Sequence, residues 1–224
     1  MKLTAQQIEM INEALIAKGL IYDDIKLELI DHIATDIELE NEQSNFEDAF
    51  FKVFSKWEKS LEKTSSFWLA NLAPRIVIEK YSSLYKSLFK YSLLSVIVFS
   101  VLLTAITILN PEECVYNLLK LVFASVYSLS CLTIITSLFF IWKLKSKTIY
   151  GRFFQKNCSY LGFYFFIIYT FLNDHTHLYR HYHRASFFEN FMDWFMPGFF
   201  FFVSVYLIMT AIVHFKIVKK YKLL

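Results

Sequence analysis

Four long apolar stretches constrain this chain more than any other feature of its sequence. They cover residues 91–109, 121–142, 158–172 and 194–215. Three of them have 19 to 22 residues, which at about 1.5 Å per residue is enough to cross a hydrocarbon core of roughly 30 Å. The third has 15 strictly apolar residues, so it needs flanking residues or a locally thinner bilayer to cross.

The composition supports a membrane protein. Of the 224 residues, 56% are hydrophobic and the mean hydropathy is +0.40, whereas soluble domains are about 45–50% apolar. Only 4 Gly and 3 Pro are present, which leaves little room for β-turns or glycine-rich phosphate loops. We therefore predict an all-α polytopic membrane protein with four transmembrane helices, preceded by an N-terminal cytoplasmic three-helix module.

Basic residues around the apolar stretches predict the orientation. One side of the four predicted spans holds 11 of them, and the other side holds only Lys120, Arg180 and Arg184. The positive-inside rule then places both termini in the cytoplasm. Residues 1–19 are polar and amphipathic, so we expect no cleaved signal peptide. The basic residues are Lys86, Lys90, Lys143, Lys145, Lys147, Arg152, Lys156, Lys216, Lys219, Lys220 and Lys222.

Charge also divides the chain into regions. Residues 1–80 contain 9 Lys/Arg and 15 Asp/Glu, a net −6, and residues 81–224 contain 14 and 5, a net +9. We predict an acidic cytoplasmic module at 1–63, an interfacial linker at 64–90 and a four-helix membrane domain at 91–224. Because the module is acidic and the basic excess follows membrane topology, nucleic acid is not an expected partner.

The module divides into three amphipathic helices. The first starts with a Thr4–Gln7 capping box and ends at Gly19, the second covers about 23–41, and the third starts with a Ser44–Glu47 box. The expected core residues are Ile8, Ile11, Leu15, Ile25, Leu29, Ile30, Ile33, Ile37, Phe46, Phe50, Val53, Phe54, Trp57 and Leu61. Near the last span, Ser186 and Glu189 predict a further short amphipathic helix that ends at Pro197.

The predicted spans contain no Asp, Glu, Lys or Arg, and this disfavours a transporter or proton pump. They do carry small and hydroxyl residues four positions apart, which indicates close helix packing or, alternatively, the polar face of a pore formed by several copies. These pairs are Ser100 with Thr104, Ala124 with Ser128, and Thr133 with Ser137.

Four histidines gather in the loop before the last span: His175, His177, His181 and His183. In a helix His177 and His181 would share one face, and neutral imidazoles bind Zn, Cu or Ni, with Glu189 or Asp193 available as a further ligand. The neighbouring Tyr and Arg side chains equally suit anchoring in the headgroup region. A patch whose charge responds to pH is the third interpretation.

A second candidate group lies on the second helix. Glu28, His32 and Asp36 are spaced four residues apart and share one face, with Asp31 beside them. We interpret these four residues as a protein-contact surface, because one helix face offers too few ligands for a metal ion and neighbouring carboxylates favour a charged, solvated histidine.

A resemblance rests on Gly19, Tyr22, the segment ELIDHI at 28–33, the acidic stretch that follows and the Phe-rich helix at 46–57. On these residues the chain resembles small four-span membrane proteins of Bacteroidetes-type bacteria. More loosely, residues 4–60 are similar to the helical prefix modules of some bacterial permeases and of HAAS-type signalling proteins. The Gly-Asp-Pro-like closing turn of the HAAS type is missing after Trp57. The resemblance implies a regulatory or protein-contact role and a location in a bacterial inner membrane, and it carries over no catalytic residue.

Three functions follow as hypotheses. The first is a non-enzymatic inner-membrane anchor or adaptor that presents the module for protein contact or self-assembly, with the bilayer and a homo-oligomer or membrane complex as partners. The second is an oligomeric pore or depolarising effector of a stress or phage-defence system. The third is an outward-facing metal-binding or metal-sensing protein. No residue pattern indicates a catalytic site, a cofactor other than a possible transition metal, or a small-molecule substrate.

Overall fold

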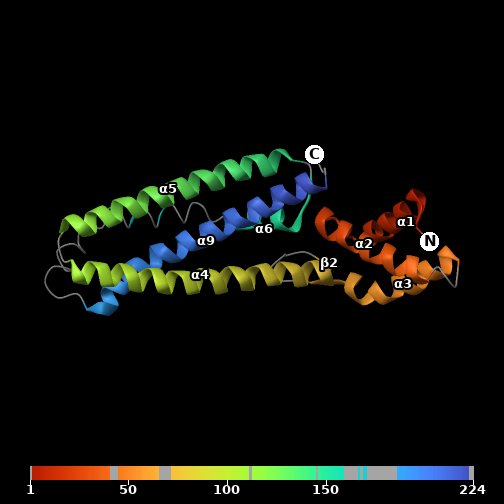
Figure 1. The fold of residues 1–224 in the computed structure, drawn as a ribbon, viewed down its shortest axis with the longest axis horizontal. Helices are drawn as coiled ribbons and strands as arrows, with labels where there is room; N and C mark the ends of the chain where they lie inside the picture. Colours follow the sequence, from red (N-terminus) through yellow and green to blue (C-terminus); the bar gives the residue numbers. More distant parts are fainter. Residues whose placement is uncertain are drawn as a thin grey trace. The chain divides into compact units, whose positions relative to one another are not determined.

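The computed structural model describes residues 2–40, 45–65, 72–110, 113–144, 146–158, 166, 169–170 and 186–221 (Figure 1). The described part is all-α except for one two-stranded hairpin. It forms two compact units. The first unit comprises Met1–Tyr85, Lys145–Arg152 and Lys216–Leu224, and the second comprises Lys86–Leu144 and Phe153–Phe215.

The first helix, α1 (Ala5–Ala17), has both of its predicted ends. Thr4 and Gln7 form the capping box, in which the Thr4 hydroxyl accepts from the Gln7 N–H and the Gln7 side chain accepts from the Thr4 N–H. At the other end Gly19 adopts φ +88°, and the Gly19 and Leu20 N–H groups donate to the carbonyls of Ile16 and Leu15. This is a Schellman motif, so Gly19 provides the left-handed residue that the motif requires.

Helices α2 (Asp23–Glu40) and α3 (Phe46–Leu61) pack with α1 around a small apolar core. The buried residues are Ile11, Leu15, Ile25, Leu29, Ile33, Ile37, Ala49, Val53 and Leu61. Ile8 was expected in this core but is 39% exposed, and Ile30 is only half-buried. Asn45 caps α3 by accepting from the Asp48 N–H, one position after the predicted cap Ser44, which lies outside the described residues.

A short hairpin follows α3. Strand β1 (Lys63–Ser65) pairs antiparallel with β2 (Leu72–Pro74), with Lys63 opposite Pro74, and helix α4 (Arg75–Leu109) begins directly afterwards. Much of the segment predicted as a linker, 64–90, is therefore the start of a 35-residue helix. The physical reason is an apolar stripe at helical spacing, Val77, Tyr81, Leu84 and Leu88, all of which are buried.

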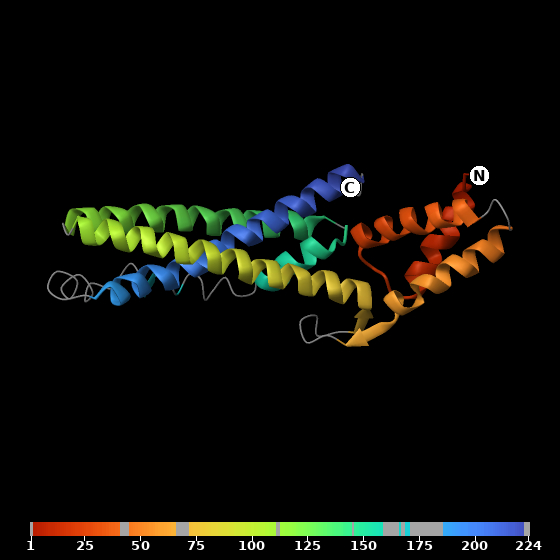
Figure 2. The ribbon, with the colours of Figure 1, turned by 60° about the horizontal axis from the view of Figure 1, so that its bottom comes forward.

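In the second unit, α4 packs beside α5 (Glu113–Lys143) and α9 (Phe187–Lys220) through aromatic side chains. The ring centroids of Phe99 lie 5.7 Å from Phe123 on α5 and 5.6 Å from Phe202 on α9. Between α5 and α9, Tyr116 lies 5.7 Å from Trp194 and Phe123 lies 5.6 Å from Phe201. Residue numbers rise together along this last pair, so α5 and α9 run parallel to each other (Figures 1 and 2).

Helix α9 corrects one prediction. Its start has the expected capping box, with Ser186 and Glu189 bonded reciprocally, but the helix continues through Pro197 to Lys220. A proline removes one backbone hydrogen bond, a cost that packing on both sides offsets here. Trp194 is buried before it, and Gly198 follows it at a close approach, since an added Cβ would lie 3.1 Å from side-chain atoms of Val96 and Phe99.

Among the described residues, three helices are long and apolar enough to cross a membrane: Arg75–Leu109, Cys114–Lys143 and Phe187–Lys220. They contain three of the four predicted spans. The remaining prediction, a span at 158–172, falls almost entirely outside the described residues. The described part also includes α6 (Ile149–Cys158), which precedes it.

Candidate functional site

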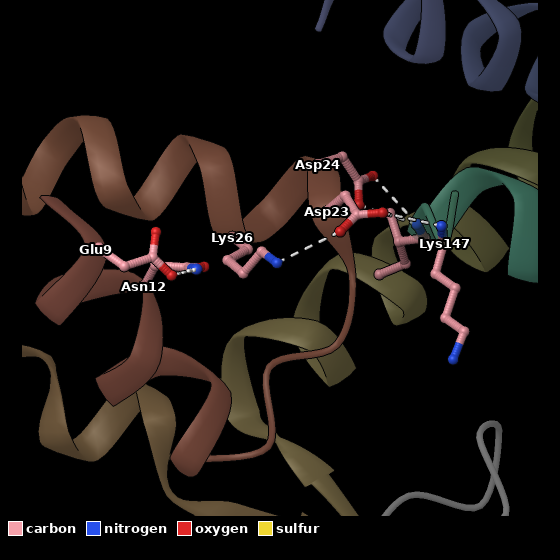
Figure 3. A network of polar contacts seen from close by, with 7 residues as sticks. Glu9, Asn12, Asp23, Asp24, Lys26 and Lys147 are labelled. Atoms are coloured by element: carbon pink, nitrogen blue, oxygen red, sulfur yellow. Dashed lines mark hydrogen bonds and ion pairs between the residues drawn. The ribbon is translucent and has the colours of Figure 1, made fainter. Parts of the chain in front are cut away.

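The start of α2 is joined to a segment far away in the sequence, the connection between α5 and α6. The Asp23 N–H donates to the Lys147 carbonyl at 2.7 Å, and the Lys147 N–H donates to Asp23 Oδ2 at 3.0 Å. Figure 3 shows the Asp23 and Asp24 side chains directed from α2 toward this connection. Both segments belong to the first unit, so the N-terminal helices and the α5–α6 connection form one folded body.

Asp24 caps a helix other than its own. The Ile149 N–H, at the first position of α6, donates to both carboxylate oxygens of Asp24 at 3.1 Å. Thr148 supplies the ordinary N-cap of α6, because its hydroxyl accepts from the Gly151 N–H at 3.0 Å. The two side chains thus satisfy orphan N–H groups that every helix start exposes, and one of them comes from the N-terminal helices.

Burial changes the acid chemistry of this junction. Asp24 is only 9% exposed, and its burial raises the pKa of the carboxyl to about 6. The hydrogen bond from Ile149 and the nearby charge of Lys80 act in the opposite direction without overcoming burial. Burial likewise raises the pKa of the neighbouring Tyr22, against the charge of Arg152. We call this group of contacts, Asp23 and Asp24 with Lys147 and Ile149, the α2–α6 junction.

A second feature of the first unit is an aromatic strip on α3. Phe46, Phe50 and Phe54 are stacked at intervals of one helical turn, with ring centroids 5.9 and 5.2 Å apart. They are half-buried, and the adjacent Phe51 is 71% exposed. The fully buried residues of α3 are Ala49, Val53 and Leu61, so these four Phe side chains, three of which were predicted in the core, are only partly covered. We call them the α3 aromatic strip.

The predicted contact residues of α2 do not form a single surface in the structure. Glu28 and Asp31 are exposed and line a cavity described below. His32 is also exposed, but its ring stacks on Trp57 of α3 with centroids 6.4 Å apart. Asp36 is half-buried. The helical spacing of these residues indicated a common face, whereas the neighbouring helices divide that face between two environments.

The small and hydroxyl pairs of the spans also fall in different environments. Ser100 and Thr104 on α4 are completely buried, and Ala124 on α5 is 6% exposed. Ser128 and Thr133 donate to carbonyls of their own helix, those of Ala124 and Leu129. Ser137 is half-buried. Burial of Ser100 and Thr104 within one chain favours helix packing for that pair.

The predicted metal ligands His175, His177, His181 and His183 lie outside the described residues. Of the two additional candidate ligands, Glu189 is engaged in the capping box of α9 and Asp193 is half-buried. In the part of the chain that the structure describes, no three His, Cys, Asp or Glu side chains are grouped so that they could hold a metal ion. The histidine site therefore stays a prediction.

Sequence reasoning missed the α2–α6 junction. It identified Asp23 only as the start of a helix, and it treated Lys147 as one of the topology-determining basic residues. Two consecutive acids at a helix start suit the helix dipole in any case, so their sequence contains no signal for a remote partner. No protein-family model, curated protein or solved structure matches the chain.

Proposed function

We propose that the chain is a non-enzymatic bacterial inner-membrane protein with four spans and both termini in the cytoplasm. Its N-terminal helices form a head at the cytoplasmic face for contact with other proteins or with further copies of the chain. The α3 aromatic strip is the observation that carries this proposal, because its four Phe side chains are only partly covered within the chain.

The parallel course of α5 and α9 supports four crossings. If both helices cross the membrane in the same direction, the chain between residues 144 and 186 has to cross back, and the predicted span at 158–172 lies in this interval. With α4 and α5 this makes an even number of crossings, so the two termini share one side. The excess of basic residues on that side favours the cytoplasm.

The α2–α6 junction supports a fixed head rather than a freely tethered one. A tethered module would need no contacts beyond its connection to the first span, here the hairpin and α4. Instead, residues of α2 are hydrogen-bonded to the connection between α5 and α6, so the head is held at two points of the chain. A head whose helices are joined to the α5–α6 connection as one folded body loses less entropy on binding than a loosely ordered one.

The strip also has the chemistry of a protein contact. Aromatic side chains contribute most of the energy at protein interfaces, and they bury a large area at a low cost in side-chain entropy. Phe51 is the most exposed member at 71%. Lys52 and Lys56 beside the strip are paired with Glu40 of α2, at 2.6 and 3.6 Å, so the charges nearby are already partly neutralised within the head.

Photo-crosslinking from α3 in native membranes tests this proposal. A benzophenone amino acid at position 51 should crosslink to a protein, either a second copy at twice 26.6 kDa or another chain. Position 59 is the matched control, because Lys59 is exposed on the same helix and lies about 80° around the helix axis from Phe51, on the side away from the strip. The proposal fails if position 51 gives no protein crosslink, or if both positions give the same products at the same yield.

A pore formed by several copies is the alternative, and one observation bears on it. Of the predicted pore-face residues, Ser128 is exposed on α5, although its hydroxyl is bonded to its own helix. Ser100 and Thr104 are enclosed within one chain and would have to be uncovered to line an opening. Single-channel recording in planar bilayers would favour the pore if Ser128→Leu altered a wild-type conductance and Ser100→Ala did not.

A further inference from the structure

A cavity of about 630 Å³ opens in the first unit, where residues of α2 meet the start of α4, the start of α6 and the end of α9. This volume falls within the range of small-molecule sites, about 300–1,000 Å³. Its apolar wall includes Ile8 and Ile30, two of the residues that were predicted in the core. Their partial exposure is explained by this cavity, since both side chains face it rather than the interior of the helices.

Charged side chains of both signs surround the apolar wall. Glu28 and Asp31 come from α2, Lys80 comes from the first turns of α4, and Lys220 comes from the last turn of α9. Among the described residues none of these four forms an ion pair, so no lysine ammonium lies within 4.0 Å of a carboxylate across the cavity. The third acid, Asp24, is already bonded to Ile149.

Two tyrosines complete the lining. Lys220 Nζ lies 4.9 Å from the ring centroid of Tyr221 and 3.4 Å from its hydroxyl, and Tyr150 comes from α6. Phenolic hydroxyls donate hydrogen bonds to anionic oxygens, and lysine is a common point-charge partner of phosphate. The cavity therefore offers cationic and donor groups from α4, α6 and α9, together with acceptor carboxylates from α2.

We propose that this cavity binds a zwitterion of the phosphoethanolamine type, in which Lys80 and Lys220 hold the phosphate and Glu28 and Asp31 hold the primary ammonium. A purely anionic ligand would pair with the lysines but would be repelled by the two carboxylates. A purely cationic ligand would pair with the carboxylates but would be repelled by the two lysines. Only a ligand with both charges satisfies all four side chains. The apolar wall accommodates the carbon skeleton attached to the headgroup.

Such a zwitterion has two sources, a phospholipid headgroup or its soluble glycerol derivative. Helix α9 brings Lys220 to the cavity five residues beyond the predicted end of the last span at 215, about 8 Å along a helix. The polar layer on each side of a bilayer is roughly 5–8 Å thick, so this position lies close to lipid headgroups. The two sources have the same charges and differ in the acyl chains.

Calorimetric titration of the full chain in a maltoside detergent tests the proposal. The probes are glycerophosphoethanolamine, dihexanoyl phosphatidylethanolamine, dihexanoyl phosphatidylglycerol, glycerophosphate and ethanolamine. We expect saturable binding of the first or second probe and at least tenfold weaker binding of the last three. Dihexanoyl phosphatidylglycerol and glycerophosphate lack the ammonium group, and ethanolamine lacks the phosphate. Equal binding of the two zwitterions identifies the headgroup alone as the ligand, and preference for the lipid identifies the membrane as the source.

Two double variants should change the ligand preference in opposite directions, whereas misfolding would weaken the binding of every probe. Lys80→Gln with Lys220→Gln keeps the carboxylates and should shift the preference toward ethanolamine. Glu28→Gln with Asp31→Asn keeps the lysines and should shift it toward phosphatidylglycerol. Lys86→Gln and Asp36→Asn, outside the cavity lining, are the matched controls and should bind as the wild type does. The proposal is overturned if the wild type binds neither zwitterion saturably, or if the double variants keep the wild-type order of preference.

Discussion

Asp24 provides the sharpest test of the structure, because one carboxylate joins the N-terminal helices to α6. Two substitutions separate its two properties. Asp24→Ala removes the acceptor from the Ile149 N–H, whereas Asp24→Asn keeps one acceptor oxygen and removes the ionisation. The difference between the two variants measures the hydrogen bond, and the difference between Asn and the wild type measures the cost of the buried charge.

The structure provides both magnitudes. Ile149 is completely buried, so the alanine variant leaves a buried N–H without an acceptor, at a cost of about 1–3 kcal/mol relative to asparagine. The second magnitude comes from the pKa of Asp24, which burial raises from 3.8 to about 6. A carboxyl with this pKa makes the folded junction less stable by about 3 kcal/mol at pH 7.5, when it has to ionise in a buried position.

The sign of the pH dependence follows from the raised pKa. The protonated form is favoured in the folded junction, so the full stability is present below pH 3.8 and is lost as the pH rises through about 6. Between pH 5 and 7.5 the wild-type junction should weaken by about 1.4 kcal/mol as Asp24 ionises. The asparagine variant should lose the dependence.

Hydrogen exchange read by mass spectrometry on a peptide covering 146–152 is the assay, with rates corrected for intrinsic base catalysis. Relative to asparagine, the alanine variant should exchange about 5- to 150-fold faster, the equivalent of 1–3 kcal/mol in the opening equilibrium. Asp36→Ala on the same helix is the control and should match the wild type. Equal exchange in the alanine and asparagine variants would refute the capping argument. A wild-type pH profile equal to that of the asparagine variant would refute the argument from burial.

Four further predictions concern other parts of the chain. Gly198→Leu should lower the thermal midpoint by overpacking α4 against α9, at about 1–3 kcal/mol, and an unchanged midpoint would contradict the close approach. Gly19→Ala should cost about 1–2 kcal/mol in thermal unfolding because its φ is +88°, while the neighbouring Lys18→Ala should have little effect. In a cysteine-free background, a cysteine at position 186 should react with a membrane-impermeant maleimide from outside and one at position 219 should not; the reverse result would overturn the proposed orientation. Metal analysis should find less zinc, copper or nickel when the four loop histidines, His175, His177, His181 and His183, are replaced by alanine. Equal metal content in the variant and the wild type would dismiss the metal hypothesis.

Local patterns accounted for much of the described structure. The capping boxes at Thr4 and Ser186 and the stop at Gly19 were predictable, because a helix end is determined by hydrogen bonds among residues a few positions apart. Helical periodicity also predicted most of the α1–α3 core. It failed for Ile8 and Ile30, which line a cavity, and for four aromatic residues of α3 that are only half-buried: Phe46, Phe50, Phe54 and Trp57. Periodicity says which side chains share a face but not which of them the neighbouring helices cover.

Helices α4 and α9 show that local sequence signals for helix ends can fail. Pro197 suggested a helix end, but the backbone continues because Trp194 and Gly198 pack on either side of it. At the start of α4, residues 64–90 were predicted as an interfacial linker, yet a buried stripe makes residues 75–90 part of a long helix. In both cases tertiary packing outweighs a local cost of a few kcal/mol.

By itself, the sequence determined the positions of the three helices that are long and apolar enough to cross a membrane, and several helix ends, because these depend on composition and on short-range spacing. Only the tertiary structure brought Asp23 and Asp24 to Lys147 and Ile149, more than 120 residues away. Only it placed two acids and two lysines around one cavity. Contacts of this range depend on how whole helices pack, and a pattern of neighbouring residues does not encode which distant backbone group a carboxylate will meet.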